Sequence, residues 1–405
     1  MRTPLIVGGV TVVLAGSIAT VALARGEKPA DAPQVSPAST SATRAPPAAS
    51  QDTTTSPTSA TTLPTGPALF PNGLPVDIGP LPSGLASASA QGCAACHWTA
   101  HDTWATGAHA RAGQAPSYRA AVHAAGDTTA CTQCHQPLVV QHAQLAAGYV
   151  EGDITRPRMQ PNPSFDATLL SEGVTCATCH LRAGTVLGTR DVAEAPHPVQ
   201  ASADLADGVT ACATCHQLSW PDGDRPFYDT VGEWKASRWA GAGVTCVTCH
   251  MPPEGAPRLG AAGGVPTHGA GAELARALTA LVHVREPVAR RGQPLDVELI
   301  LQNTGAGHSF PTGNPNTVAT VEVRLVDDKG KDLAPAWTQT LARKVEEKRP
   351  WKTLSDDRLP AGGQRAGSHT FTPALKGTPC DGAIEVRVKK GAANVLLRRV
   401  PVAVR

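Results

Sequence analysis

The pattern C-x-x-C-H occurs five times between Cys93 and His250. Its cysteines are Cys93/Cys96, Cys131/Cys134, Cys176/Cys179, Cys212/Cys215 and Cys246/Cys249, and its histidines are His97, His135, His180, His216 and His250. Two thiols one helical turn apart can form thioethers with one porphyrin, and the histidine that follows can ligate its iron, so this spacing is the attachment signature of c-type haem. The sequence therefore predicts five covalently attached haems c.

Other chemistries of cysteine do not account for the five histidines. Zinc sites use cysteine pairs two at a time, and an odd number of C-x-x-C-H units fits them poorly. A disulfide framework gives the histidines no role, and a thioredoxin-like motif would occur once. Ten of the eleven cysteines lie in the motifs, and we expect the remaining one, Cys380, to be a buried free thiol.

Nine further histidines are candidates for the second axial position of each iron. A second histidine gives a six-coordinate, low-spin haem suited to electron transfer, whereas an empty position leaves a site for substrate. His123 and His142 flank the second motif, and we expect at most one of them to ligate. The nine are His101, His109, His123, His142, His197, His268, His283, His308 and His369.

The first 88 residues predict an export or anchor segment followed by a linker. Residues 1–24 are almost wholly apolar after Arg2 and predict a secretory signal or an uncleaved N-terminal membrane anchor. Residues 25–88 are rich in Pro, Ala, Ser and Thr and predict a disordered linker. Haem c is attached after export, so we expect a periplasmic or cell-surface protein.

The remaining chain predicts an α+β protein. Residues 89–272 hold all five motifs, separated by stretches too short to fold alone, so we expect one mainly helical and loop pentahaem domain. Helical pieces are expected at 97–112, 116–125, 138–147 and 228–240, with loops at 151–165 and 251–267. Residues 273–405 show period-two alternation, as in Leu295-Val297-Leu299-Leu301, and predict an antiparallel β-sandwich.

Four phrases resemble multihaem c-type cytochromes related to the nitrifiers' tetrahaem cytochrome. They are Trp104-x-x-x-x-His109-Ala110, Glu233-Trp234-Lys235-Ala236-Ser237, Gly243-Val244-Thr245-Cys246-Val247-Thr248-Cys249-His250-Met251-Pro252 and Asn303-Thr304-Gly305-Ala306-Gly307-His308-Ser309-Phe310-Pro311-Thr312-Gly313. The resemblance implies that His109 and His197 are distal ligands, makes His268 and His308 good candidates, and supplies no clear fifth ligand. It also implies helical haem packing followed by a β-sandwich.

These features favour an electron carrier that passes electrons through closely packed, mostly bis-histidine haems. Its partners would be other cytochromes or a membrane quinol-oxidising complex, and a net charge of +2 does not favour nucleic acid. The alternative is a haem oxidoreductase that acts on a small nitrogen or sulfur compound at one open haem. A haem polymer assembled through the sandwich is a third hypothesis, which a linker of this kind makes less attractive.

Overall fold

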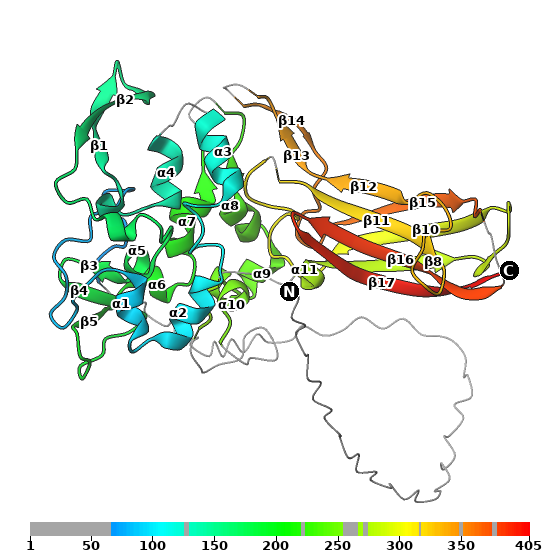
Figure 1. The fold of residues 1–405 in the computed structure, drawn as a ribbon, viewed down its shortest axis with the longest axis horizontal. Coiled ribbons are helices and arrows are strands. Elements are labelled where there is room, and N and C mark those ends of the chain that lie inside the picture. The colour runs from blue at the N-terminus through cyan, green and yellow to red at the C-terminus, as the bar shows by residue number, and fades with distance from the viewer. Residues whose placement is uncertain are drawn as a thin grey trace, which may run out of the picture. The chain divides into compact units, whose positions relative to one another are not determined.

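The computed structural model describes residues 66–124, 129–219, 223–253, 266–269, 274–315, 317–347, 351–374 and 379–405 (Figure 1). The expected signal or anchor and the expected linker up to residue 65 lie outside them. Every described residue belongs to one compact unit, Thr61–Arg405. Within the described ranges, no helix is long and apolar enough to cross a membrane.

Short helices carry the attachment motifs. Four of them end on a motif histidine: α4 (Thr129–His135), α5 (Cys176–His180), α7 (Thr210–His216) and α10 (Cys246–His250). The first motif starts in α1 (Ala90–Ala94) and ends just before α2 (Trp98–Ala105). Residues three apart on a helix share a face, so one helical turn presents both sulfurs of a motif on the same side.

The other helices lie between these motif helices, except α11, which follows the last of them. They are α3 (Pro116–Ala124), α6 (Ala203–Ala206), α8 (Thr230–Lys235), α9 (Arg238–Gly241), α11 (Leu274–Ala277) and the 3-10 turns η1 (Val139–Gln141) and η2 (Ala167–Leu169). Helices α2, α3, α8 and α9 fall where helices were expected, and α2 is shorter than its predicted range.

Small sheets in the same region correct two predictions. The expected helix at 138–147 is only the short turn η1 followed by the start of β1 (Gln144–Val150), and most of the expected loop at 151–165 is β2 (Asp153–Pro161), which forms a hairpin with β1. Its turn residues, Glu151 and Gly152, have φ of 54° and 76°, as a two-residue type I′ turn requires. Further short strands are β3 (Leu181–Arg182), β4 (Thr185–Gly188), β5 (Val199–Ala201), β6 (Gln217–Leu218) and β7 (Tyr228–Asp229).

Residues 66–88 are packed, which corrects the C-terminal end of the predicted linker. Leu69 is fully buried, and Val76 and Ile78 join a hydrophobic cluster that includes Leu138 and Leu169. The Val76 backbone pairs with the chain at Leu138: its N–H donates to the Pro137 carbonyl at 2.7 Å, and its carbonyl accepts from the Val139 N–H at 2.9 Å. A few apolar side chains and paired backbone groups therefore order a stretch whose composition alone indicates disorder.

The C-terminal part consists of long strands, coloured yellow to red in Figure 1. A three-stranded sheet has the order β15-β10-β8 and a five-stranded sheet the order β12-β11-β16-β17-β9, with a separate hairpin of β13 and β14. The strands are β8 (Leu278–Val284), β9 (Val288–Ala289), β10 (Leu295–Asn303), β11 (Ala319–Val326), β12 (Trp337–Leu341), β13 (Arg343–Val345), β14 (Thr353–Asp356), β15 (Gln364–Phe371), β16 (Cys380–Lys390) and β17 (Ala393–Val404).

One hydrophobic cluster fills the space between the two sheets. Alternate residues of β10, from Leu295 to Leu301, and of β11, from Ala319 to Leu325, are buried in it. All pairings within these two sheets are antiparallel except that of β17 with β9. The predicted mixture of helices and strands is confirmed.

Candidate haem sites

A repeated turn leads into three of the motif helices. Gly173, Gly208 and Gly243, each followed by Val-Thr, have φ of 60°, 66° and 70°, the left-handed region that glycine adopts at low cost. At Gly173 a side chain is also excluded by space, because its Cβ would lie 2.5 Å from the carbonyl oxygen of His109. The glycine therefore lets the turn before Cys176 approach the backbone of a candidate distal histidine.

Two tryptophans donate hydrogen bonds to the valine of this turn, one before the third motif and one before the fifth. The indole N–H of Trp104 donates to the Val174 carbonyl at 2.8 Å, and that of Trp234 donates to the Val244 carbonyl at 2.8 Å. The Val174 N–H in turn donates to the His109 carbonyl at 2.9 Å. These bonds fix the third and fifth motifs against the segments that carry Trp104 and Trp234.

Thiols from different motifs lie in contact. Cys93 is hydrogen-bonded to Cys176, Cys134 to Cys215 and Cys212 to Cys246. The bond from Cys176 lowers the pKa of Cys93 to about 7 and raises that of Cys176. The contacts join the first motif to the third, the second to the fourth and the fourth to the fifth, although these motifs are not all consecutive in the sequence.

Cys96 is more exposed than the other motif cysteines. Cys96 is exposed, whereas the other nine are half-buried. Helix α1 ends at Ala94, and a turn continues the chain to the motif histidine: the Cys96 and His97 N–H groups donate to the Cys93 carbonyl at 3.2 and 2.9 Å. A thioether at Cys96, as at the other motif cysteines, stays a prediction.

Four motif histidines each face a second histidine. The ring centroids lie 6.4 Å apart in His97–His197, 6.3 Å in His109–His216, 6.3 Å in His180–His268 and 6.2 Å in His250–His308. Two imidazoles on one metal would place their centroids about 6.3 Å apart, with bonds of about 2.0 Å and about 1.15 Å from each nitrogen to its ring centre. All four spacings fit one iron between each pair of rings.

The protonation state of these imidazoles also suits a metal. Burial lowers the pKa of His109 to about 4 and lowers the pKa of His180, His216, His268 and His308 as well. These rings are therefore neutral near pH 7, and a neutral imidazole is the form that binds metals.

Backbone carbonyls select the tautomer of several rings. The Nδ1 atoms of His180, His268 and His308 lie 2.7, 2.8 and 3.0 Å from the carbonyl oxygens of Leu187, Pro266 and Ser309. A carbonyl only accepts, so Nδ1 carries the proton and Nε2 keeps its lone pair for a metal. His197 differs, because its Nδ1 is buried without a hydrogen-bond partner among the described residues and would be satisfied by a metal.

The second motif has a different environment. His135 donates from Nδ1 to the Ala112 carbonyl at 2.9 Å, and its ring stacks on Tyr118 with centroids 3.9 Å apart and planes 8° apart. All fourteen histidines lie in the described ranges, and in these ranges none is in ring contact with His135. His123 is exposed on α3, and the Nε2 of His142 is 2.7 Å from the Gln136 carbonyl, so neither ring is paired with His135 as the rings of the other four motif histidines are paired.

Two acidic residues that the sequence analysis missed bind the starts of the motif helices. Glu172 accepts hydrogen bonds from the Ser89 hydroxyl, the Ala90 N–H and the Thr175 hydroxyl, so it bridges α1 and α5. Asp207 accepts from the Val209 and Thr210 N–H groups at 2.8 Å. Both stand directly before the Gly of a Gly-Val-Thr phrase, and this shared position was the available signal.

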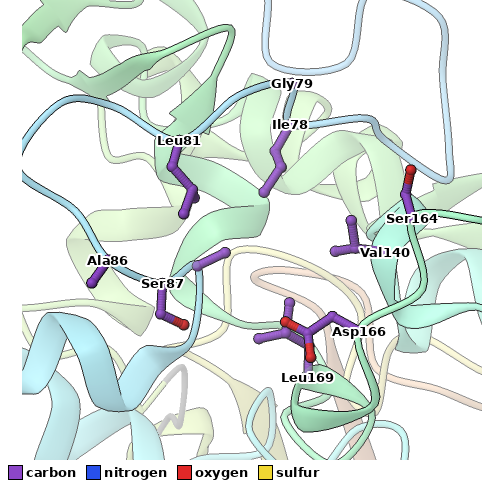
Figure 2. A pocket seen from close by; sticks show the side chains of 10 residues that line it. Ile78, Gly79, Leu81, Ala86, Ser87, Val140, Ser164, Asp166 and Leu169 are labelled. Carbon is purple, nitrogen blue, oxygen red and sulfur yellow. The ribbon is translucent and has the colours of Figure 1, made fainter.

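A hollow of about 250 Å³ lies beside the cluster formed by residues 66–88 (Figure 2). Ile78, Leu81, Val140 and Leu169 line it, together with Ser87, Ser164 and Asp166. Its lining contains no cysteine and no histidine, so the hollow is separate from the attachment motifs.

Comparison with solved structures supports a fold of the multihaem cytochrome kind. No protein-family model and no curated protein matches the chain. The crystal structure of a penta-heme cytochrome c552 from Thermochromatium tepidum matches over 78% of this chain and 98% of its own, with a TM-score of 0.52 and 17% identity. The CARDB domain of the PF1109 protein from Pyrococcus furiosus matches over 32% of this chain and 87% of its own, with 17% identity and a TM-score of 0.20, which supports no inference. The chain therefore has a multihaem cytochrome-like fold.

Proposed function

We propose that this protein is an exported electron carrier that holds five covalent haems c, four of them with two histidine ligands. The observation that carries the proposal is the set of four histidine pairs, each with ring centroids 6.2 to 6.4 Å apart and each containing one motif histidine. A haem bound in this way changes oxidation state without binding substrate. Its distal ligands would be His109, His197, His268 and His308.

The proximity of the motif thiols supports a path for electrons. Thiol contacts connect the first motif to the third, and they connect the second and the fifth motifs to the fourth. These contacts do not join the two groups to each other, but Cys179 of the third motif raises the pKa of Cys212 and of Cys215 in the fourth through its charge, so the two motifs are near one another. Porphyrins anchored at these sulfurs would be neighbours, so one electron could pass from motif to motif.

The protein's part in this function is to fix and shield the metal sites. The haem supplies the reversible one-electron chemistry, and the chain supplies ligand orientation and exclusion of water. Hydrogen bonds from Nδ1 to backbone carbonyls orient His180, His268 and His308. Burial lowers the pKa of these three rings, which keeps them neutral. We propose other cytochromes or a membrane quinol-oxidising complex as redox partners, with no role for nucleic acid, and a periplasmic or cell-surface location.

A second candidate function rests on the second motif. His135 stacks on Tyr118 and faces no histidine among the described residues, so the haem attached at Cys131 and Cys134 would have one open axial position. Burial raises the pKa of Tyr118 and of Tyr228 to about 12, which keeps both phenols protonated beside this motif. Such a site suits a haem oxidoreductase acting on a small nitrogen or sulfur compound.

Intact mass and electron paramagnetic resonance test both candidates. We expect a mass increment of five haems and, in the oxidised protein, four low-spin haems with one of a different type. Cyanide added to the oxidised protein should alter one haem only. Fewer than four low-spin haems would overturn the bis-histidine assignment. Five low-spin haems whose spectra do not change on addition of cyanide would rule out the oxidoreductase hypothesis.

A further inference from the structure

The loop that carries His308 connects the C-terminal sheets with the haem-binding region. It follows β10 and faces the last motif, where the rings of His308 and His250 are 6.2 Å apart and inclined by 19°. Within the loop, the Asn303 amide donates to the His308 carbonyl at 2.8 Å, and its oxygen accepts from the Ala306 N–H at 3.0 Å. The sheets thus shape the loop from one side.

Glu233 of α8 holds the same loop from the other side. Its Oε2 accepts hydrogen bonds from the Ser309 N–H at 3.1 Å and the Thr312 hydroxyl at 2.8 Å. Its Oε1 lies 2.7 Å from Nη1 of Arg358, a residue of the C-terminal part. The Glu233 and Arg358 side chains are only 9% and 8% exposed, so the ion pair is shielded from water.

Neighbouring contacts leave the loop little freedom. A Cβ on Gly307 would lie 3.3 Å from the indole rings of Trp234 and Trp239, so the backbone next to His308 packs directly on α8 and α9. Arg358 is itself oriented by Asp356, whose Oδ1 is 2.7 Å from its Nε. Because a buried carboxylate is stable only when it is paired and hydrogen-bonded, Glu233 ties the position of this loop to that of Arg358.

We infer that Glu233 is a positioning residue that holds His308 opposite His250, so that the C-terminal sheets control the coordination of the fifth haem. The inference rests on the proposed function, because it takes His308 to be an iron ligand. Glu233 does not touch the metal site itself. Its role is to keep a ligand supplied by one part of the chain aligned with a motif in the other.

The test compares Glu233→Gln with Glu385→Gln in the full-length, haem-loaded protein. Glu385 is a matched control because its side chain is 8% exposed and pairs with Arg399 at 2.6 Å and Arg387 at 3.3 Å, within the five-stranded sheet. We expect E233Q to convert one low-spin haem to high spin, or to shift its g-values and midpoint potential. Added imidazole should restore the low-spin signal, because it replaces a displaced ligand but does not refold a chain. E385Q should leave all five haems unchanged.

Two further variants keep the outcome decisive. Thr312→Val removes one hydroxyl contact of Glu233 and should give a smaller change in the same haem, even if E233Q does not accumulate. His308→Ala should convert that haem fully. If H308A changes one haem while E233Q and T312V change none, the inference is wrong and the proposed coordination stands. If H308A changes none, the proposed coordination of the fifth haem is itself wrong. A spectral change in E385Q equal to that in E233Q would also overturn the inference.

Discussion

Replacement of Leu138 by alanine tests whether residues 66–88 are a structural part of the haem-binding region. Leu138 is fully buried in the cluster that contains Val76 and Ile78, and its backbone neighbours pair with Val76. The change removes three carbon atoms, worth about 2.4 kcal/mol at about 0.8 kcal/mol each. The cavity that remains raises the expected loss of stability to about 3–4 kcal/mol.

A loss of this size is measurable as a shift in thermal midpoint. At an unfolding entropy of about 2.1 cal/mol/K per residue, the midpoint of a unit that spans Thr61–Arg405 shifts by about 1.4 °C for each kcal/mol, so L138A should unfold about 5 °C below the parent protein. The transition is followed in the oxidised holoprotein by loss of low-spin absorbance. Limited proteolysis before the transition should show earlier cleavage within residues 66–88 than in the parent.

Leu354→Ala is the matched control. Leu354 lies on β14 with 66% of its surface exposed, and loss of an exposed leucine should change stability by no more than about 0.5 kcal/mol. Equal midpoints for L138A and L354A would refute the reasoning, because residues 66–88 would then contribute no measurable stability through this cluster.

Three other predictions follow from the same structure. Deletion of residues 26–65 should leave haem content and visible spectrum unchanged, whereas deletion of 26–88 should lower both haem yield and thermal midpoint; equal behaviour of the two deletions would contradict the corrected boundary. Burial lowers the pKa of His109 to about 4, so as pH falls below about 6.5 the unfolded chain binds a proton before the folded chain does. The free energy of unfolding should therefore be constant above about pH 6.5 and decline between about pH 6.5 and about pH 4. Loss of the low-spin signal already near pH 6 would contradict the low pKa. Glu172→Gln removes a negative charge shared by the first and third motifs and should raise two midpoint potentials by some tens of millivolts in a redox titration, with the other three unchanged.

The parts of the site that follow from local chemistry were predictable from the sequence. Spacing within C-x-x-C-H predicts which residues would attach a porphyrin, and the residue types identify the histidine candidates. The matching of partners was not predictable, because it depends on contacts between distant segments. His109 follows the first motif yet lies opposite His216 of the fourth, and His197 precedes the fourth motif yet lies opposite His97 of the first.

Two predictions about the fold were wrong for physical reasons that amino-acid composition does not show: the helix and loop replaced by the β1–β2 hairpin, and the C-terminal end of the linker. The hairpin of β1 and β2 contains Ala146, Ala147 and Gly148, which are poor strand formers, so its Glu151-Gly152 turn was the better signal. Residues 66–88 share the Pro- and Ala-rich composition of the preceding stretch, but they also carry large apolar residues, of which Leu69, Val76 and Ile78 are buried. Such a segment becomes ordered by packing against other parts of the chain, here Leu138 and Leu169, and this packing surface exists only in the folded protein.

The contacts between thiols of different motifs also constrain how the protein is made. In the folded chain, Cys93 lies against Cys176 and Cys134 against Cys215. A chain that folded before haem attachment in an oxidising compartment would therefore hold unmodified thiols within reach of one another, where disulfide formation is favourable. Each such bond would join two motifs and block the thioethers of both. With haem at the motifs as proposed, biogenesis must either attach the porphyrins faster than the chain folds or keep the motif thiols reduced until attachment.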